Sequence, residues 1–393
     1  PSTNTSRFVQ YQWFNELNSF VTSIDDDGYA SPPTGNVTYH QNSALDKMHG
    51  QHVGGTVAGQ YYGWAREANI YSMAILDPYF HSGQNINGWL MYDFLRAFHL
   101  HKAVNSVTGR RNPTITNHSY GGIFALNPEN EVLSFSKLIS VSYRGTTYNS
   151  GNPGPSGWSQ SGVETDFGLK FNLTSYPFYS AGLAADIQDA IDDGVIFVGA
   201  AGNDALLIAE PSSSDWDNTF TFEYDTGDIQ TKLYNRGSWP SSPDTDAIVV
   251  GSLSNQASFA RADSSMFGAG VDVYAPGQNI ISCYSNTGTN DTKYSAGSGN
   301  YYGLGSGSSM ASPQVAGVSA ILATAKPRFT NSDVKGYLQR HSKDNDMPSG
   351  AHSNKYLLSK NPRSTSGMID DVKGERKTSG MTFPRRATLN YVA

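Results

Sequence analysis

Five short apolar segments, rich in Val and Ile, constrain the fold of this chain more than any other feature. They occupy residues 20–25, 69–76, 114–118, 195–201 and 247–253. A strand that is apolar at nearly every position is buried on both faces, which is typical of a parallel sheet covered by helices on each side. The segments therefore predict a largely parallel sheet in the interior of the protein.

Helical patterns lie between and after these segments. They cover residues 49–59, 88–106, 181–193, 312–326 and 330–340. In the second of them one stripe at helical spacing holds Leu90, Phe94, Phe98 and His101. Strands and helices in alternation predict an α/β domain built on a mostly parallel, doubly wound sheet.

Two stretches interrupt the alternation, at residues 123–180 and 204–246. Both are rich in Gly, Ser, Pro, Asn and aromatic residues and show no sustained period. Loops of this length inside a compact domain are usually functional or carry a small structure of their own. We expect them to be two long insertions that wall a cleft on the surface of the domain.

The chain is predicted to divide into a domain over residues 1–343 and a polar extension over 344–393. Residues 352–393 hold eight Lys and Arg against three Asp and Glu, whereas the chain as a whole has a net charge of −7. A basic tail behind an acidic body is expected to be solvated, to pack as a strap, or to contact an assembly partner.

Composition excludes several classes of protein. The acidic balance argues against non-specific nucleic-acid binding. A single cysteine, Cys283, excludes an internal disulfide framework and a cysteine-rich zinc site. No apolar run of about 18 residues is present, so no spanning helix is expected. The polar start without an initiator Met suggests that a leader was removed or the chain was trimmed.

A serine-rich segment before the helical pattern at 312–326 has the character of a catalytic site. Residues 305–317 read Gly-Ser-Gly-Ser-Ser-Met-Ala-Ser-Pro-Gln-Val-Ala-Gly. A serine at a helix N-terminus lies where free N–H groups and the helix dipole favour developing negative charge. Pro313 is expected in the first turn, which would set the start of the helix. An ordinary serine-rich turn is the alternative interpretation.

This segment resembles the nucleophile signature of the subtilisin-like serine proteases, the subtilases or peptidase family S8. The resemblance makes Ser309 the nucleophile, with Ser308 where Thr is usual. A second segment, residues 49–59 with the sequence His-Gly-Gln-His-Val-Gly-Gly-Thr-Val-Ala-Gly, resembles the histidine motif of the same family. It implies that His49 is the general base and His52 a structural neighbour. The family also implies a three-layer αβα architecture.

Three further segments resemble the same family. Residues 198–204 resemble the oxyanion-hole segment, which implies that Asn203 and the Ser309 backbone N–H stabilise the tetrahedral intermediate. An Asn in a simple turn is the alternative. Ser119, Tyr120 and Gly121 match the edge that pairs with the substrate backbone. Residues 272–277 resemble a structural Ala-Pro-Gly turn before the nucleophile.

The acidic member of the triad is expected near the start of the chain. Residues 21–28 read Val-Thr-Ser-Ile-Asp-Asp-Asp-Gly, and the family pattern fits Asp26 best. Asp25 is the alternative, because it directly follows Ile24. Asp46, three residues before His49, is expected to cap the next helix. The interval from Asp26 to His49 is shorter than the family pattern leads us to expect, which leaves open a degraded triad or an Asp from elsewhere.

No metal site is assigned from the sequence. Many family members bind calcium in a loop after the histidine helix, but residues 59–65 lead directly toward the next strand and form too short a loop for the oxygen ligands that calcium requires. Weak calcium binding at acidic positions in the second insertion is the alternative to solvated loops. These positions are Asp215, Asp217, Asp225 and Asp228.

The resemblance implies a serine endopeptidase that hydrolyses protein or peptide substrates through an Asp-His-Ser triad and an acyl-enzyme, with no cofactor required. An alternative is a weak or inactive protease-fold protein that serves in a larger assembly, such as a virion or a cell surface. An esterase or acyl transferase is ranked last, because no Gly-x-Ser-x-Gly elbow encloses Ser309. The expected location is extracellular, with a virion-associated protein as the other possibility.

Overall fold

The computed structural model describes most of the first 342 residues and one short segment beyond them. The described ranges are 7–24, 35–37, 49–74, 88–125, 133–173, 175–224, 227–255, 260–284, 293–297, 300–342 and 355–356.

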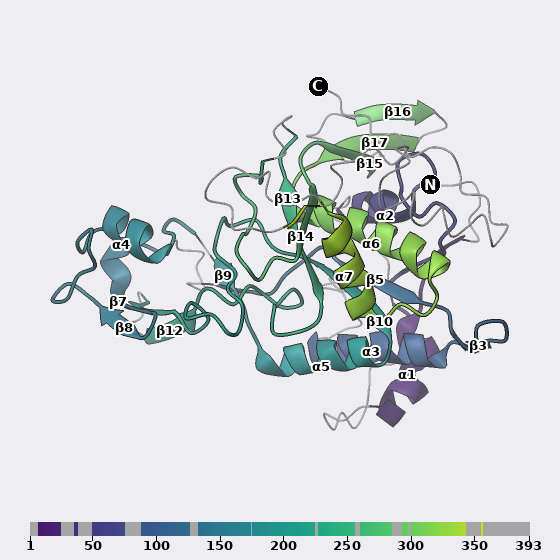
Figure 1. Ribbon diagram of the computed structural model, residues 1–393, viewed down its shortest axis with the longest axis horizontal. Coiled ribbons are helices and arrows are strands. Elements are labelled where there is room, and N and C mark those ends of the chain that lie inside the picture. Colours follow the sequence, from purple (N-terminus) through teal and green to yellow (C-terminus); the bar gives the residue numbers. More distant parts are fainter. Residues whose placement is uncertain are drawn as a thin grey trace.

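A five-stranded parallel sheet forms the centre of the molecule (Figure 1). Its strands, in spatial order, are β18 (Lys355–Tyr356), β14 (Val273–Pro276), β13 (Ile248–Leu253), β10 (Val195–Ala200) and β5 (Thr114–His118). Every neighbouring pair is parallel. The predicted strands at 114–118, 195–201 and 247–253 are confirmed to within one residue, and all six residues of β10 and of β13 are buried.

Helices cover both faces of this sheet, so the domain has three layers. One face carries α2 (His49–Ala58), α6 (Ser308–Ala325) and α7 (Asn331–His341), and the other carries α3 (Gly88–His101) and α5 (Ala181–Asp192). Side chains of β10 alternate between the layers: Ile196 and Val198 pack toward α6 and α7, whereas Val195 and Phe197 pack toward α3 and α5. The predicted α/β architecture with a parallel sheet between helical layers is confirmed.

The predicted strand at 20–25 is wrong. Residues 13–24 form the helix α1 (Trp13–Ile24), and Asp25 lies outside the described residues. The buried side chains Trp13, Leu17 and Val21 recur every four residues, so one helical face packs against α3. The buried helical face begins at Trp13, eight residues before Val21, the first β-branched residue of the predicted strand. Packing of this face against α3 decides the conformation.

Two helix boundaries also differ from expectation. The helix predicted at 88–106 ends at His101, and β3 (Val104–Asn105) and β4 (Arg110–Arg111) then form a small hairpin before β5. The helix predicted at 312–326 begins at Ser308, so Pro313 lies in its second turn instead of its first. A side-chain contact from Ser119, the residue after β5, compensates for the proline and is described below.

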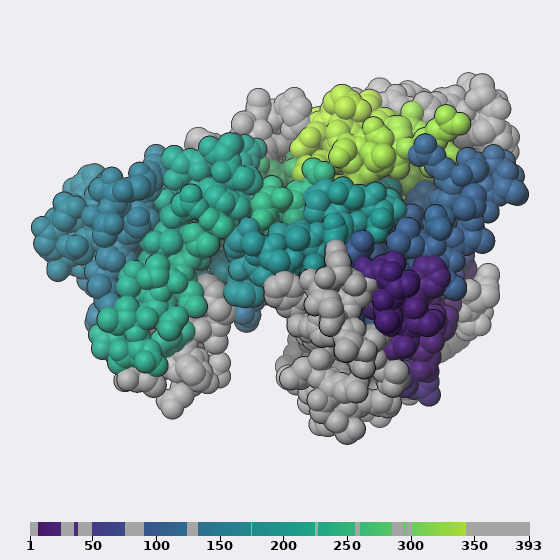
Figure 2. Space-filling view, turned by 90° about the horizontal axis from the view of Figure 1, so that it is seen from below, coloured from purple at the N-terminus to yellow at the C-terminus, as the bar shows by residue number. Residues whose placement is uncertain are grey.

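The two insertions fold together into one lobe. Strands β7 (Leu138–Tyr143) and β8 (Thr146–Tyr148) come from the first insertion, and β11 (Thr219–Glu223) and β12 (Ile229–Leu233) come from the second. They form one antiparallel sheet in the order β12-β11-β7-β8. Helix α4 (Gln160–Phe167) packs on this sheet, and Figure 2 shows the residues of both insertions gathered on one side of the molecule.

Shorter strands complete the fold. Strands β1 (Phe8–Gln10) and β2 (Ile70–Ser72) pair in parallel, and β6 (Ile123–Ala125) pairs with β9 (Ser175–Pro177). An antiparallel sheet of β15 (Ile280–Tyr284), β17 (Asn300–Gly305) and β16 (Lys293–Gly297) lies against α2. None of the helices in the described part of the chain is long and apolar enough to cross a membrane.

Candidate active site

The first turn of α6 lies at the carboxyl edge of the central sheet, where a backbone hydrogen bond joins Gly307 to Gly277. The N–H of Gly307, the residue that caps α6, donates to the carbonyl of Gly277 after β14 at 2.6 Å. A side chain at Gly277 would collide with Ser252 and approach the Gly307 carbonyl to 2.7 Å. The Ala-Pro-Gly turn thus needs glycine because the start of α6 passes so close to it.

Ser309 is the second residue of α6 and is partly exposed. Its hydroxyl donates to the backbone carbonyl of Ser119 at 3.2 Å, and the Ser119 hydroxyl donates to the Ser309 carbonyl at 2.8 Å. Within the described residues no hydrogen bond joins Ser309 to His49. The serine therefore lies at the N-terminal end of the helix dipole, directly beyond the end of β5.

Asn203 lies next to Ser309, in the turn that follows β10. Its Oδ1 accepts the backbone N–H of Ser308 at 2.8 Å, and the N–H of Gly202 donates to the Ser308 hydroxyl at 3.1 Å. Oδ1 accepts this bond, whereas the Nδ2 group, which can only donate, has no hydrogen-bond acceptor among the described residues. Asn203 is exposed, so this donor is available beside Ser309.

His49 begins α2, a helix that runs alongside α6. The imidazole of His52 lies about 3.0 Å from where a side chain at Gly305 would stand, and the carbonyl of Val57 lies 3.0 Å from the equivalent position at Gly317. The early part of α2 is thus beside the start of α6 and the later part is beside its middle. The two helices begin at the same end, which brings His49 and Ser309 to one edge of the domain.

His52 is buried and serves the packing of α2. Its Nε2 bonds the carbonyl of Ile280 at 2.8 Å, so this nitrogen carries a proton, and its Nδ1 has no partner among the described residues. Burial lowers the pKa of His52 and keeps the ring neutral. The Ser282 hydroxyl donates to the His52 carbonyl at 2.7 Å, which ties α2 to β15.

At the expected substrate edge, residues 119–121, the side chain of Ser119 contacts α6, whereas the backbone of the next two residues is not hydrogen-bonded within the described part of the chain. The Ser119 side chain is turned toward α6, and the Tyr120 hydroxyl accepts from or donates to Nδ1 of His118 at 2.7 Å beneath the edge. Gly121 is exposed, whereas Gly122 is buried and its N–H donates to the carbonyl of Trp239 at 2.8 Å. In the part of the chain that the structure describes, no hydrogen bond occupies the backbone of Tyr120 or Gly121. These two backbones are open to an added strand.

Asp25, Asp26 and Asp46 lie outside the described residues. The acidic residue adjacent to the site in the described part is Asp204, which follows Asn203 and whose pKa is raised by burial.

Comparison with known proteins identifies the family. A family model described as the subtilase family, Peptidase S8, matches residues 10–357. The chain belongs to the subtilase family. Subtilisin E from Bacillus subtilis (strain 168) is 28% identical over 227 residues, which is 56% of this chain and 49% of that protein. Alkaline protease 1 from Emericella nidulans is 24% identical over 278 residues, 70% of this chain and 42% of that protein.

This subtilase spans about half the length of the curated relatives that it matches. Among solved structures, that of a cold adapted subtilisin-like serine proteinase covers 92% of this chain and 84% of its own, with 21% identity and a TM-score of 0.49.

Backbone carbonyls in and around the segment after α2, where calcium was considered from the sequence, accept hydrogen bonds. The carbonyls of Gly59 and Ala65 accept backbone N–H groups. The guanidinium of Arg7 donates to the carbonyls of Ala58 at 3.3 Å and Ala68 at 2.8 Å. Four carbonyls in and next to this segment are thus hydrogen-bonded, two of them to a cationic side chain.

Two acidic positions of the second insertion are paired with arginines. Asp215 accepts two hydrogen bonds from Arg144, at 2.8 and 2.9 Å, and Asp217 bonds Arg236. The bond from Arg144 lowers the pKa of Asp215. Of the other candidates, Asp225 lies outside the described residues. The described residues contain no group of three His, Cys, Asp or Glu side chains that could hold a metal.

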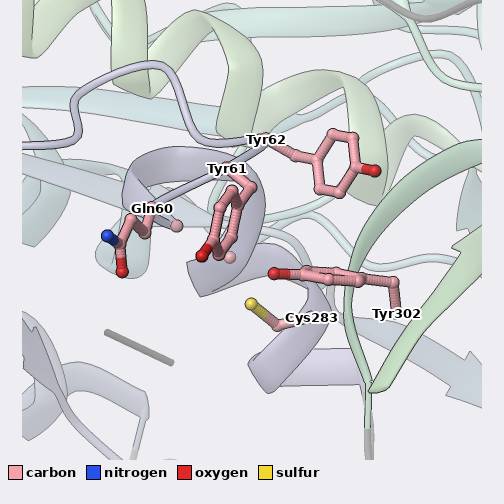
Figure 3. Close-up of a pocket in the computed structure, with 7 residues that line it drawn as sticks. Gln60, Tyr61, Tyr62, Cys283 and Tyr302 are labelled. Atoms are coloured by element: carbon pink, nitrogen blue, oxygen red, sulfur yellow. The ribbon is translucent and has the colours of Figure 1, made fainter. Parts of the chain in front are cut away.

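A narrow pocket lies at the other end of α2 from His49. Figure 3 shows the side chains of Tyr61, Tyr302 and Cys283 that line it, with the rings of Tyr61 and Tyr302 packed edge to face. The ten residues of α2 extend about 15 Å. This pocket is therefore separate from the site at Ser309.

Sequence reasoning missed two contributors to the geometry of the site. The Ser308 hydroxyl, treated only as a departure from the usual Thr, accepts the Gly202 N–H and so helps to hold Asn203. Asn117 donates from Nδ2 to the Ser119 hydroxyl at 2.9 Å. The signal for the second was its position on β5, two residues before Ser119, which directly follows the strand.

Proposed function

We propose that this subtilase is a serine endopeptidase acting on protein or peptide substrates, with Ser309 as nucleophile and His49 as general base. The observation that carries the proposal is the position of Ser309 at the start of α6, with Asn203 bound to the same turn through Ser308. A donor side chain and a helix N-terminus beside one serine suit the stabilisation of an oxyanion.

In the proposed mechanism the Ser309 hydroxyl turns from the Ser119 carbonyl to the imidazole of His49. Its oxygen attacks the scissile carbonyl carbon while His49 takes the proton. The new oxyanion accepts hydrogen bonds from the Ser309 backbone N–H and from Nδ2 of Asn203. Collapse of the intermediate expels the amine, which receives the proton from His49, and water then hydrolyses the acyl-enzyme by the same route.

We assign the acid of the triad to Asp26, with Asp25 as the alternative. Its role is to hold the imidazole of His49 in the productive tautomer and to stabilise the imidazolium. The substrate is proposed to add as a strand beside Tyr120 and Gly121, whose open backbones support this arrangement. The mechanism uses no cofactor. We further infer an extracellular enzyme, supported by the low Lys and Arg content of the chain.

Reaction with a fluorophosphonate probe tests the proposal. We expect labelling of the native protein, no labelling of Ser309→Ala, and slow labelling of Asp26→Asn with little change in Asp25→Asn. A folded native protein that is not labelled and cleaves no peptide would refute the peptidase. The protease names of the relatives favour the enzyme over a structural component of an assembly.

A further inference from the structure

We propose that Asn117 is a positioning residue for Ser309 and acts through the side chain of Ser119. The inference rests on the proposed function, because it concerns how the nucleophile is held. Asn117 lies on β5, and within the described residues its side chain makes no hydrogen bond to His49 or Asn203. Its two polar atoms are both used, one toward β5 and one toward α6.

The starting point is a hydrogen bond that α6 cannot make for itself. In an α-helix the carbonyl of residue 309 would accept the N–H of residue 313. That residue is Pro313, which has no N–H. The hydroxyl of Ser119 donates to the Ser309 carbonyl at 2.8 Å and so takes the place of the missing donor. This contact lets α6 begin at Ser308 despite the proline.

The side chain of Asn117 sets the direction of this bond. Its Nδ2 donates to the Ser119 hydroxyl at 2.9 Å, and its Oδ1 accepts from the Ser312 hydroxyl at 2.8 Å. An amide nitrogen can only donate and an amide oxygen can only accept. The single proton of Ser119 is therefore directed to the Ser309 carbonyl.

This chain of bonds holds α6 at two points, Ser309 and Ser312, one turn apart. Ser312 is fully buried and Ser119 is 6% exposed, so water cannot easily replace a lost partner. Ile115, two residues before Asn117 on the same face of β5, packs against the apolar side of α6. The hydrogen bonds of Asn117 and Ser119 thus extend the apolar contact between β5 and α6.

The position of the Ser309 hydroxyl depends on this contact. The helix carries Ser309 only one residue after the turn that binds Asn203, and a small displacement of a reacting group has a large effect on rate. Asn117 would therefore affect the reaction of bound substrate more than the binding of substrate.

The informative variant is Asn117→Asp. A carboxylate still accepts from Ser312, but it cannot donate to Ser119, so the Ser119 proton is drawn to it and the Ser309 carbonyl loses its donor. We expect kcat for a peptide substrate and the acylation rate by a fluorophosphonate to fall on the order of 10-fold to 100-fold. KM should stay unchanged, because Asn117 does not bind substrate. The midpoint of the pH–rate profile should stay unchanged in Ser119→Ala, which adds no titratable group.

Ser319→Ala is the matched control. Ser319 is fully buried in the same helix, and its hydroxyl donates to the Val315 carbonyl at 2.8 Å. This variant also loses one buried hydroxyl bond of α6, but far from its first turn. We expect a comparable loss of thermal stability with kcat unchanged. Ser119→Ala, which removes the same donor directly, serves if Asn117→Asp does not fold.

Amide hydrogen exchange in residues 308–310 provides a readout that does not need activity. Faster exchange there in Asn117→Asp or Ser119→Ala, but not in Ser319→Ala, supports the positioning role. Acylation and exchange equal to the native protein in both variants would overturn it. If the native protein is not acylated at all, the proposed peptidase fails, and the exchange comparison by itself decides whether Asn117 positions the first turn.

Discussion

The backbone N–H of Ser308 donates to Oδ1 of Asn203 at 2.8 Å, across 105 residues of sequence. One bond thus joins the turn after β10 to the residue before the proposed nucleophile. It also orients the Asn203 amide, because the oxygen faces the helix and leaves the nitrogen free to donate. The same side chain has a structural role and a proposed catalytic one, and substitutions can separate the two.

Asn203→Asp keeps an oxygen for the Ser308 N–H and removes the donor. We expect kcat to fall about 10²–10³-fold with little change in thermal stability, since only the stabilisation of the oxyanion is lost. Asn203→Ala should lose kcat to a similar extent and stability as well. Steady-state kinetics and thermal unfolding of both variants test this. An Asn203→Asp enzyme with normal kcat would exclude the oxyanion role.

Acid should destabilise the protein through His118. The His118 ring is buried and stacked on that of Phe197, with the ring centroids 3.9 Å apart. Burial lowers the pKa of His118 from 6.5 to about 3. The folded-state pKa is below the unfolded one, so the unfolded chain binds the extra proton between these values. This contribution to stability is therefore complete above pH 6.5 and decreases by about 1.4 kcal/mol per unit as the pH falls toward 3.

Denaturant unfolding between pH 7 and pH 4 tests this contribution. His118→Gln should reduce the slope of unfolding free energy against pH. His99, whose pKa burial lowers to about 4, contributes in the same direction, so His99→Gln should also flatten the curve. A slope that is unaffected by His118→Gln would show that this ring takes up no proton on unfolding.

Gly122→Ala should disturb the substrate edge. An added Cβ would collide with the indole of Trp239, whose carbonyl accepts the Gly122 N–H at 2.8 Å. We expect a loss of about 1–3 kcal/mol in stability, as for other overpacked sites, and a higher KM for peptides. Gly54→Ala is the control, because a Cβ there meets nothing within 4 Å and alanine favours the helix. Equal stability of the two variants would contradict this account.

The ion pair between Arg144 and Asp215 should protect the lobe from proteolysis. Arg144 lies in the turn between β7 and β8, with a φ of 50°. Its guanidinium donates from Nε and Nη2 to the two carboxylate oxygens of Asp215. In a Ser309→Ala background, Asp215→Asn should speed tryptic cleavage after Arg144 about two- to fivefold. This corresponds to a loss of up to about 1 kcal/mol in the free energy of local opening, as expected for an ion pair near the surface. Asp217→Asn, which affects Arg236 instead, should leave that cleavage unchanged.

The sequence is informative wherever one element alone carries the signal. The buried strands β5, β10 and β13 follow from their apolar runs, and His49, Asn203 and Ser309 follow from local motifs. The motifs around these three residues are short, because each one has to place only a single side chain at the end of one strand or helix.

Local patterns fail where a distant contact decides. Val21 and Ile24 suggest a strand, but residues 13–24 form a helix because one of its faces packs against α3. In the lobe, Val141 pairs with Phe220, 79 positions later, although neither insertion shows a regular period. Pairing between two insertions cannot be deduced from the period of either one.

The sequence by itself determined three strands of the parallel sheet, the family motifs and the residues proposed for catalysis, because continuous apolar runs and short motifs depend on local chemistry. The predicted strand within 69–76 instead pairs with β1 in a separate sheet. The tertiary structure decided how those residues are held. Pro313 indicates a helix that starts at residue 312, yet α6 starts at Ser308. The physical reason is the hydroxyl of Ser119, which replaces the missing backbone donor although it lies 190 residues earlier in the sequence.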